Sequence, residues 1–306
     1  MASLREIKDR IGSVRSTLKI TSAMKLVASA KLRKAQQAAQ SLRAYEDTLS
    51  DILASALPSD SRDLSACSHT GSDLSAYSRT GSDGDSEGAR LAVVTIASNS
   101  SLCGSFNGNV IRKTLEVLSD AGKSVRGSAA SGVDVFPLGR RIADPLRRLG
   151  YVAAAPSLNE LVAHPGYEAA AALADELARA VNEGVYSKVI VVYNHFVTTS
   201  RQEVRCETLL PYVQSFSSEA SSEQDYIIEP SAGDILKTLL PQLLRLKLYA
   251  TILDSIAAEH AARMIAMQTA TDNAKDLLDS LTLEYNKGRQ QQITAEILDI
   301  VGGSQQ

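Results

Sequence analysis

Residues 246–301 read LKLYATILDSIAAEHAARMIAMQTATDNAKDLLDSLTLEYNKGRQQQITAEILDIV, and this stretch decides the fold. It contains no proline and a single glycine, Gly288. A helix of this length would run roughly 80 Å, at about 1.5 Å per residue, whereas an average helix has about 11–12 residues. It therefore needs a second helix, or other protein, beside it. The helical spacing of three and four positions is carried by Leu246, Tyr249, Leu253, Ile256, Met267, Ala270, Ala274, Leu277 and Leu281.

A second long helix is predicted over residues 3–56, ahead of Pro58. Ser3 and Glu6 have the spacing of a capping box at its start. Heptad positions counted from Leu4 are apolar except for a few polar residues, which is typical of a coiled coil. We predict that the first and last helices pair antiparallel, with everything between them folded at one end. The two seam rows are Leu4, Ile11, Leu18, Lys25, Leu32, Ala39, Glu46 and Leu53, and Ile7, Val14, Thr21, Ala28, Ala35, Leu42, Leu49 and Ala56.

A linker rich in Ser, Gly and Asp follows over residues 59–88. It contains a tandem repeat, DLSACSHTGS at 63–72 and DLSAYSRTGS at 73–82. Such a composition buries too little apolar surface to fold by itself. A duplication in a tolerant loop is the favoured interpretation, and a regulatory insert is the alternative.

The region from 90 to about 230 alternates strand and helix patterns, which indicates a Rossmann-like, mainly parallel sheet. The last two strands are joined by about three residues, so we predict an antiparallel hairpin at an edge of the sheet. Strands are predicted at Leu91–Ala97, Val133–Leu138, Lys188–Thr198 and Gln202–Leu210, and helices at Asn107–Asp120, Ile142–Leu149 and Tyr167–Glu183.

The predicted fold class is therefore α/β with a long antiparallel α-helical coiled coil, the sheet domain being inserted between the N- and C-terminal helices. The chain would divide into an N-terminal coiled-coil helix (1–57), a linker with a tandem repeat (58–89), an α/β foot domain (90–232) and a C-terminal coiled-coil helix (233–306).

The net charge of −3 hides a basic N-terminus, because residues 1–45 hold ten Lys or Arg and two acidic residues. Such a segment attracts nucleic acid, lipid head groups or an acidic protein surface, unless it is simply a solvated helix face. The three cysteines are far apart, which disfavours a disulfide framework or a zinc site and fits a reducing compartment. The sequence contains no run of about 20 apolar residues, so no membrane span is predicted. The first residues lack the apolar core of a signal peptide.

No catalytic, cofactor or metal site is predicted. Residues 100–108 join the first strand to its helix, where phosphates bind in doubly wound sheets. This segment has no GxGxxG motif and no Walker lysine, so a tight turn is the preferred interpretation. Cys103 has no histidine near it in the sequence. The four histidines are scattered, at His69, His164, His195 and His260.

Polar residues are predicted to interrupt the seam of the last helix at Arg263, Glu284 and Gln291. An ion inside a two-helix coiled coil is costly unless it is paired. This pattern suggests that other subunits surround the helices and supply the partners.

Three segments closely resemble the γ subunit of F-type ATP synthases: IKDRIGSVRSTLKITSAMKLVASAKLRKAQ at 7–36, ASNSSLCGSFNGNV at 97–110, and the stretch from AAEHAARM to EILDIVGG at 257–303. Together with the topology, the resemblance spans nearly the whole chain except residues 59–88.

The resemblance implies a central rotor shaft that has no catalytic residues of its own. The two terminal helices would stand inside a ring of three α and three β subunits, and the α/β domain would lie beside the ε subunit and the c-ring. Proton or sodium flow would turn the shaft, which would set the nucleotide affinities of the β subunits. The chain would lie peripherally on the cytoplasmic face of the bacterial plasma membrane, meeting it only through the Fo sector. The basic N-terminus then has a protein partner, and nucleic acid is not expected.

The resemblance also implies contact residues. The β-subunit contacts would be Met24 and Lys25 of a KITxAMK stretch, the basic residues Lys31, Arg33 and Lys34, Arg263 of an ARM motif, and Arg289, Gln290 and Thr294 of an RQxxIT motif. An apolar tip turning inside an apolar sleeve would consist of Ile297, Leu298, Ile300 and Val301.

One departure is Gly288, which stands where the family usually has a helix former. It costs about 1 kcal/mol of helix propensity, and we predict a kink there. Two other interpretations remain open from the residues alone. One is an α/β enzyme with helical arms, which would need a phosphate loop or a catalytic set. The other is a coiled-coil scaffold, which would tolerate alanine at Met24, Arg263 or Gln290.

Overall fold

The computed structural model describes residues 3–56, 90–124, 132–151, 158–211 and 232–303, so the linker and its repeat lie outside the described residues. The chain divides into two compact units. The first contains residues 1–30 and 263–306, and the second contains residues 31–262. Two helices, α1 (Leu4–Ala56) and α7 (Ala232–Gly303), contribute to both units.

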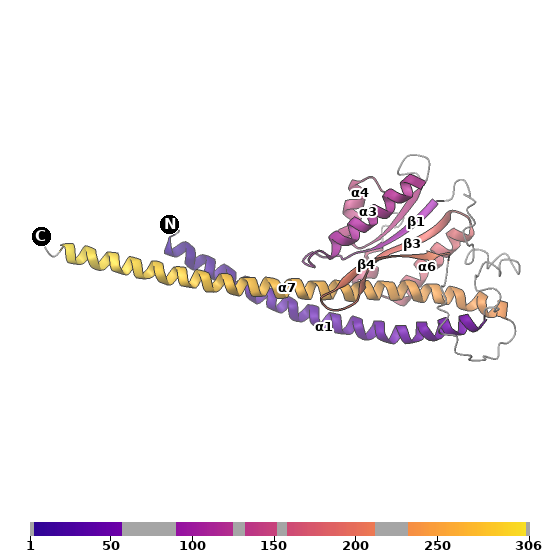
Figure 1. The fold of residues 1–306 in the computed structure, drawn as a ribbon, viewed down its shortest axis with the longest axis horizontal. Helices are drawn as coiled ribbons and strands as arrows, with labels where there is room; N and C mark the ends of the chain where they lie inside the picture. The colour runs from indigo at the N-terminus through magenta and orange to yellow at the C-terminus, as the bar shows by residue number, and fades with distance from the viewer. Residues whose placement is uncertain (1–2, 57–89, 125–131, 152–157, 212–231, 304–306) are drawn as a thin grey trace. The chain divides into compact units, whose positions relative to one another are not determined.

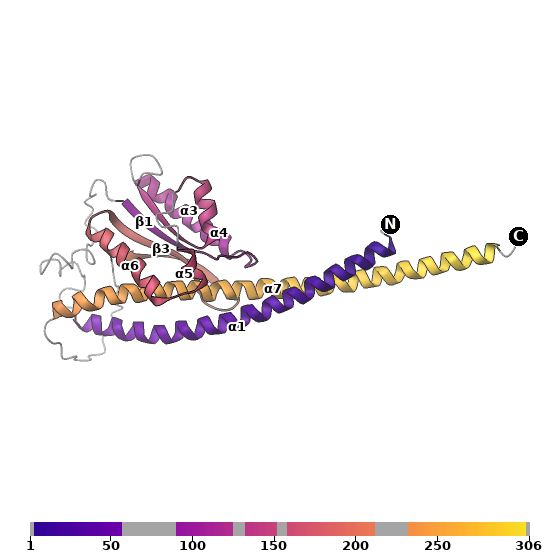
Figure 2. The ribbon, with the colours of Figure 1, turned by 180° about the vertical axis from the view of Figure 1, so that it is seen from behind.

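In the first unit, α1 and α7 lie side by side and run antiparallel (Figures 1 and 2). Two contacts fix their direction. The hydroxyl of Thr271 lies 2.9 Å from that of Thr21, and Leu4 lies against Gly288. Residue numbers therefore rise along one helix as they fall along the other, as predicted. The capping box is also confirmed: the Ser3 backbone N–H donates to Glu6 at 2.9 Å, and the Glu6 N–H donates to the Ser3 hydroxyl at 3.3 Å.

The seam of α7 in this unit differs from the predicted one in one of its two rows. Met267, Ala274 and Leu281 are buried as predicted. The other row lies one residue later than expected, on Thr271 and the half-buried Leu278 and Tyr285. A heptad can be counted with steps of three then four or of four then three, and the polar Thr271 concealed the correct choice.

The prediction that Glu284 and Gln291 occupy the seam is consequently wrong, because both side chains are exposed. Glu284 and Gln291 therefore no longer support the inference that neighbouring subunits supply partners for polar seam residues. Helix α7 is continuous through Gly288, and the position has little room for a side chain. A Cβ atom built on Gly288 would lie 3.0 Å from Cδ2 of Leu4.

The second unit contains a four-stranded sheet in the order β2-β1-β3-β4. Strands β1 (Arg90–Ile96), β2 (Val133–Leu138) and β3 (Tyr186–Phe196) are parallel. Strand β4 (Gln202–Leu210) pairs antiparallel with β3 at the edge. The four predicted strands and the antiparallel hairpin are therefore confirmed.

The helices of this unit cover both faces of the sheet. On one face, α3 (Phe106–Ser124) and α4 (Arg140–Arg148) enclose a core that includes Val93, Val110, Val135, Ile142 and Leu146. On the other face lie α6 (Tyr167–Asn182) and α7 (Figures 1 and 2). The short helix α5 (Asn159–Ala163) was not predicted.

Helix α7 is the centre of packing in the second unit. Every residue from Thr251 to Glu259 is buried, so the helix is covered on all sides there. Polar and aromatic contacts hold α6 against it: Arg245 Nε lies 2.7 Å from an oxygen of Asp175, and the rings of Tyr167 and Tyr249 meet edge to face at 5.8 Å. The helix thus joins α1, α6 and the sheet of this unit.

Candidate partner-binding surfaces

Few features of the described residues suggest small-molecule chemistry. None of these helices combines the length and hydropathy of a transmembrane segment. Within the described ranges, no cluster of three or more His, Cys, Asp or Glu side chains is arranged to hold a metal ion.

The turn that could have bound phosphate is closed by its own hydrogen bonds. The Ser98 N–H donates to Asn107 at 3.1 Å, and the Ser98 hydroxyl lies 2.6 Å from the Ser100 carbonyl. Cys103 is buried and packs with Phe106, the first residue of α3, and with Ala258 of α7. The Asn107 side-chain amide donates to the Cys103 sulfur at 3.0 Å. The segment is therefore a tight turn that attaches the sheet to α7.

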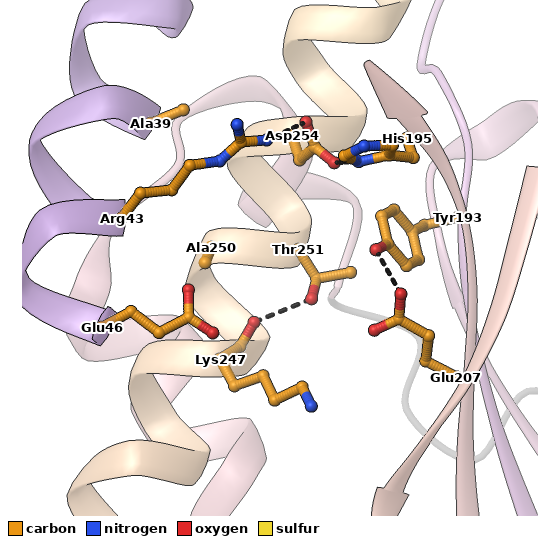
Figure 3. Close-up of a pocket in the computed structure, with 10 residues that line it drawn as sticks. All are labelled: Ala39, Arg43, Glu46, Tyr193, His195, Glu207, Lys247, Ala250, Thr251 and Asp254. Carbon is orange, nitrogen blue, oxygen red and sulfur yellow. Dashed lines mark hydrogen bonds and ion pairs between the residues drawn. The ribbon is translucent and has the colours of Figure 1, made fainter. Parts of the chain in front are cut away.

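A polar pocket of about 110 Å³ lies between α1, α7 and the β3–β4 hairpin (Figure 3). Its most prominent contact joins His195 of β3 to Asp254 of α7, with Nδ1 2.5 Å from the carboxylate. Arg43 of α1 approaches the same carboxylate at 3.7 Å. His195 appeared isolated in the sequence because its partner lies 59 residues away.

The hydroxyl groups of this pocket are already engaged. Thr251 donates to the Lys247 carbonyl at 2.8 Å, and Tyr193 donates to Glu207 at 2.9 Å. Burial, followed by the negative charge of Glu207, raises the pKa of Tyr193. Burial also raises the pKa of Glu46, against the opposing effect of Lys247. The pocket therefore contains a His–Asp pair, but the hydroxyls of Thr251 and Tyr193 donate to other groups and are not positioned as nucleophiles beside it.

The most conspicuous exposed surface is the end of α7, residues 289–303, which we call the α7 tip. Helix α1 begins at Leu4, which lies against Gly288, so α7 continues past the start of α1. These fifteen residues would extend roughly 22 Å as a single helix. The predicted tip residues Ile297, Leu298, Ile300 and Val301 are between 53% and 72% exposed.

The predicted contact residues divide between the units. In the first unit, Arg289, Gln290 and Thr294 are exposed on the α7 tip, whereas Met24, Lys25 and Arg263 are half-buried in the helix pair. In the second unit, Lys31, Arg33 and Lys34 are exposed on α1.

Sequence reasoning missed several exposed apolar residues. In α1, Ile20, Leu26 and Val27 are between 56% and 70% exposed, and in α7 Leu283 is 71% exposed. The heptad pattern could have identified them, because these residues lie off the seam rows, where an apolar side chain has no helix to pack against. They extend the apolar surface of the first unit beyond the predicted tip.

Comparisons with known proteins agree along the whole chain. A family model described as ATP synthase matches residues 3–305. The chain is 45% identical to the ATP synthase gamma chain of Phocaeicola vulgatus, over 99% of both chains. It is 42% identical to that of Bacteroides fragilis, again over 99% of both.

A solved structure supports the fold at low sequence identity. A chain of the Euglena gracilis mitochondrial ATP synthase, from its OSCP/F1/c-ring in rotational state 3, superposes with a TM-score of 0.59 at 18% identity. The match covers 98% of this chain and 92% of that one.

Proposed function

Because this chain belongs to the ATP synthase gamma chain family, we propose that it is the central rotor shaft of an F1Fo ATP synthase. It couples rotation of an ion-driven c-ring to ATP synthesis at the β subunits, and it is itself non-catalytic. Solved structures of similar fold include the rotor of a mitochondrial ATP synthase and a mitochondrial central stalk with its c-ring.

The α7 tip is the observation that carries the proposal. A fifteen-residue helix is marginal in water by itself, and an apolar side chain such as Ile300, 72% exposed, favours removal from solvent. Such a tip suits an enclosing apolar sleeve, which the ring of three α and three β subunits would supply.

The other partners follow from the same assignment. The α/β domain would bind the ε subunit and the c-ring, and membrane contact would be made only through the Fo sector. The chain would then lie peripherally on the cytoplasmic face of the bacterial plasma membrane.

The β-subunit contacts are proposed in two groups. The exposed cations Lys31, Arg33 and Lys34 suit an acidic surface. Arg289, Gln290 and Thr294 suit a loop that accepts hydrogen bonds, since all three are exposed where α7 has left α1. Met24, Lys25 and Arg263 are half-buried, so they would present only part of each side chain to a partner.

The test uses membranes that contain the assembled enzyme. We expect Arg289→Ala combined with Gln290→Ala to lower coupled ATP synthesis while the chain remains folded, because both side chains are exposed. Glu176→Gln, an exposed change on α6, is the control and should leave synthesis unchanged. Wild-type synthesis rates in the double variant would refute these contacts.

The broader assignment has a separate test. A tagged chain should co-purify with α and β subunits, in molar excess over itself, and a bead attached to it should rotate when ATP is added. A free monomer that supports neither result would refute the rotor function and favour a scaffold or an independent enzyme.

A further inference from the structure

We propose that Asp254 is a torque-transmitting contact between the α/β domain and the α1–α7 helix pair of the second unit. The proposal rests on the rotor function above and identifies a residue through which a turning force passes from the sheet into the helices. It concerns the stiffness of that connection, which is distinct from its stability.

Asp254 brings three secondary-structure elements together on one carboxylate (Figure 3). One oxygen lies 2.5 Å from Nδ1 of His195, and the other accepts the backbone N–H of Phe196 at 3.3 Å. Arg43 of α1 lies 3.7 Å from the second oxygen. The carboxylate therefore binds the end of β3 from α7 while attracting α1.

Strand β3 is well placed to collect force from the whole sheet. It is hydrogen-bonded to β1 on one side and to β4 on the other. His195 and Phe196 are its last two residues. A displacement of either neighbouring strand is therefore passed along β3 to its carboxyl end, where Asp254 binds.

The Arg245–Asp175 pair also joins the α/β domain to α7, but its side chains are more exposed to solvent than those of Asp254 and His195. The apolar contacts nearest Asp254 resist sliding less well. Cys103 and Phe106 meet Ala258 of α7 through apolar surface, and apolar contacts are non-directional. A charge-assisted hydrogen bond weakens steeply as its angle or length departs from the optimum. The side chains of Asp254 and His195 are only 12% and 18% exposed, so solvent screens their contact little.

Other charged groups face this contact, and several have their own partners. Glu207 of β4 accepts from Tyr193, and Glu203 lies opposite His195 in β4 and pairs with Arg201. Glu46 of α1 and Lys247 of α7 line the same pocket. Asp254→Asn is therefore a focused change, since it removes one charge and keeps the side-chain shape.

The test measures torsional stiffness in the assembled F1 complex containing the full chain. A bead is attached to the α/β domain through a cysteine introduced at the exposed Asp144 of α4, in a background with Cys67→Ser and Cys206→Ser. The complex is halted with a non-hydrolysable ATP analogue, and the angular variance of the bead is recorded. We expect Asp254→Asn to raise this variance at least twofold at an unchanged ATP hydrolysis rate.

Glu203→Gln is the matched control, because it lies across from His195 without binding Asp254, and its variance should equal that of the parent. If Asp254→Asn does not assemble, His195→Ala, which removes the partner at the partly exposed β3 end, should give the same increase. Parent-like variance in the assembled variant would overturn the proposal while leaving the rotor function standing. A parent bead that fails to rotate in ATP would overturn both.

Discussion

The hydroxyl of Thr271 on α7 lies 2.9 Å from the hydroxyl of Thr21 on α1, and both residues are buried in the helix pair of the first unit. Each hydroxyl also lies within hydrogen-bond distance of a carbonyl of its own helix, Thr21 at Leu18 and Thr271 at Met267, so one hydroxyl donates to its own carbonyl while it accepts from the other hydroxyl. A buried polar pair of this kind aligns two helices, because a slip along the seam leaves both hydroxyls without the partner across it.

We predict that Thr21→Val and Thr271→Val each lower the free energy of unfolding by about 0.5–1.5 kcal/mol, because each removes the hydrogen bond between the helices while the remaining hydroxyl keeps a carbonyl acceptor in its own helix. The double variant should cost less than the sum, with a coupling of about 0.5–1.5 kcal/mol. Urea unfolding of the four chains measures this coupling. Strict additivity would show that the two hydroxyls do not interact.

Gly288 offers a second double-mutant cycle. Gly288→Ala gains about 1 kcal/mol of helix propensity, but the new Cβ would lie 3.0 Å from Leu4. We expect the single change to be close to neutral in unfolding experiments. In a Leu4→Ala background the obstacle is gone, and the same change should stabilise by about 1 kcal/mol. An equal gain in both backgrounds would contradict this packing role.

The Phe106 side chain should be important for attaching the turn to α7. It is 4% exposed and packs against Cys103 and Ala258. Phe106→Ala should lower the free energy of unfolding by about 3–5 kcal/mol, and Phe106→Leu by much less, because the cavity is smaller. Thermal unfolding of both variants checks the order. A loss below about 1 kcal/mol for alanine would mean that the site collapses or is already open.

Glu46 gives a pH-dependent prediction. Burial raises the pKa of this carboxyl, so the folded chain holds the proton more tightly than the unfolded chain does. Ionised Glu46 therefore opposes folding, and stability falls as the pH rises through the raised pKa.

We expect Glu46→Gln to melt at a higher temperature than the parent at about pH 8 and at the same temperature at about pH 4, where the parent carboxyl is already protonated. Melting curves at the two pH values provide the measurement. The exposed Asp47→Asn is a neighbouring control. A gain that is equal at both pH values would show that charge burial is not its cause.

Much of the fold could be predicted because its signals are local. The sequence pattern predicts strands β2 and β4 at their observed bounds, and the spacing of Ser3 and Glu6 predicts the capping box. The α7 seam was only half right, since apolar residues at Ala270 and Leu277 lie beside the true row and Thr271 within it is polar. Periodicity alone cannot distinguish two rows that differ by one residue.

Part of the candidate site could also be predicted from the sequence, and part could not. Arg289 and Gln290 are predicted as contact residues from the family resemblance, and the structure adds that both side chains are exposed. The Asp254–His195 contact could not be predicted, because its members are 59 residues apart on different elements. Only the folded chain brings them together.

The place where α1 begins has a mechanical consequence. A lone helix is nearly circular in cross-section, about 10–12 Å across with its side chains, whereas two helices side by side are oblong. Inside the ring of subunits proposed above, the segment past Gly288 would therefore present nearly the same width in every direction as it turned. The paired segment beside Thr21 and Thr271 would act as a cam, because its longer cross-section would approach each surrounding subunit in turn.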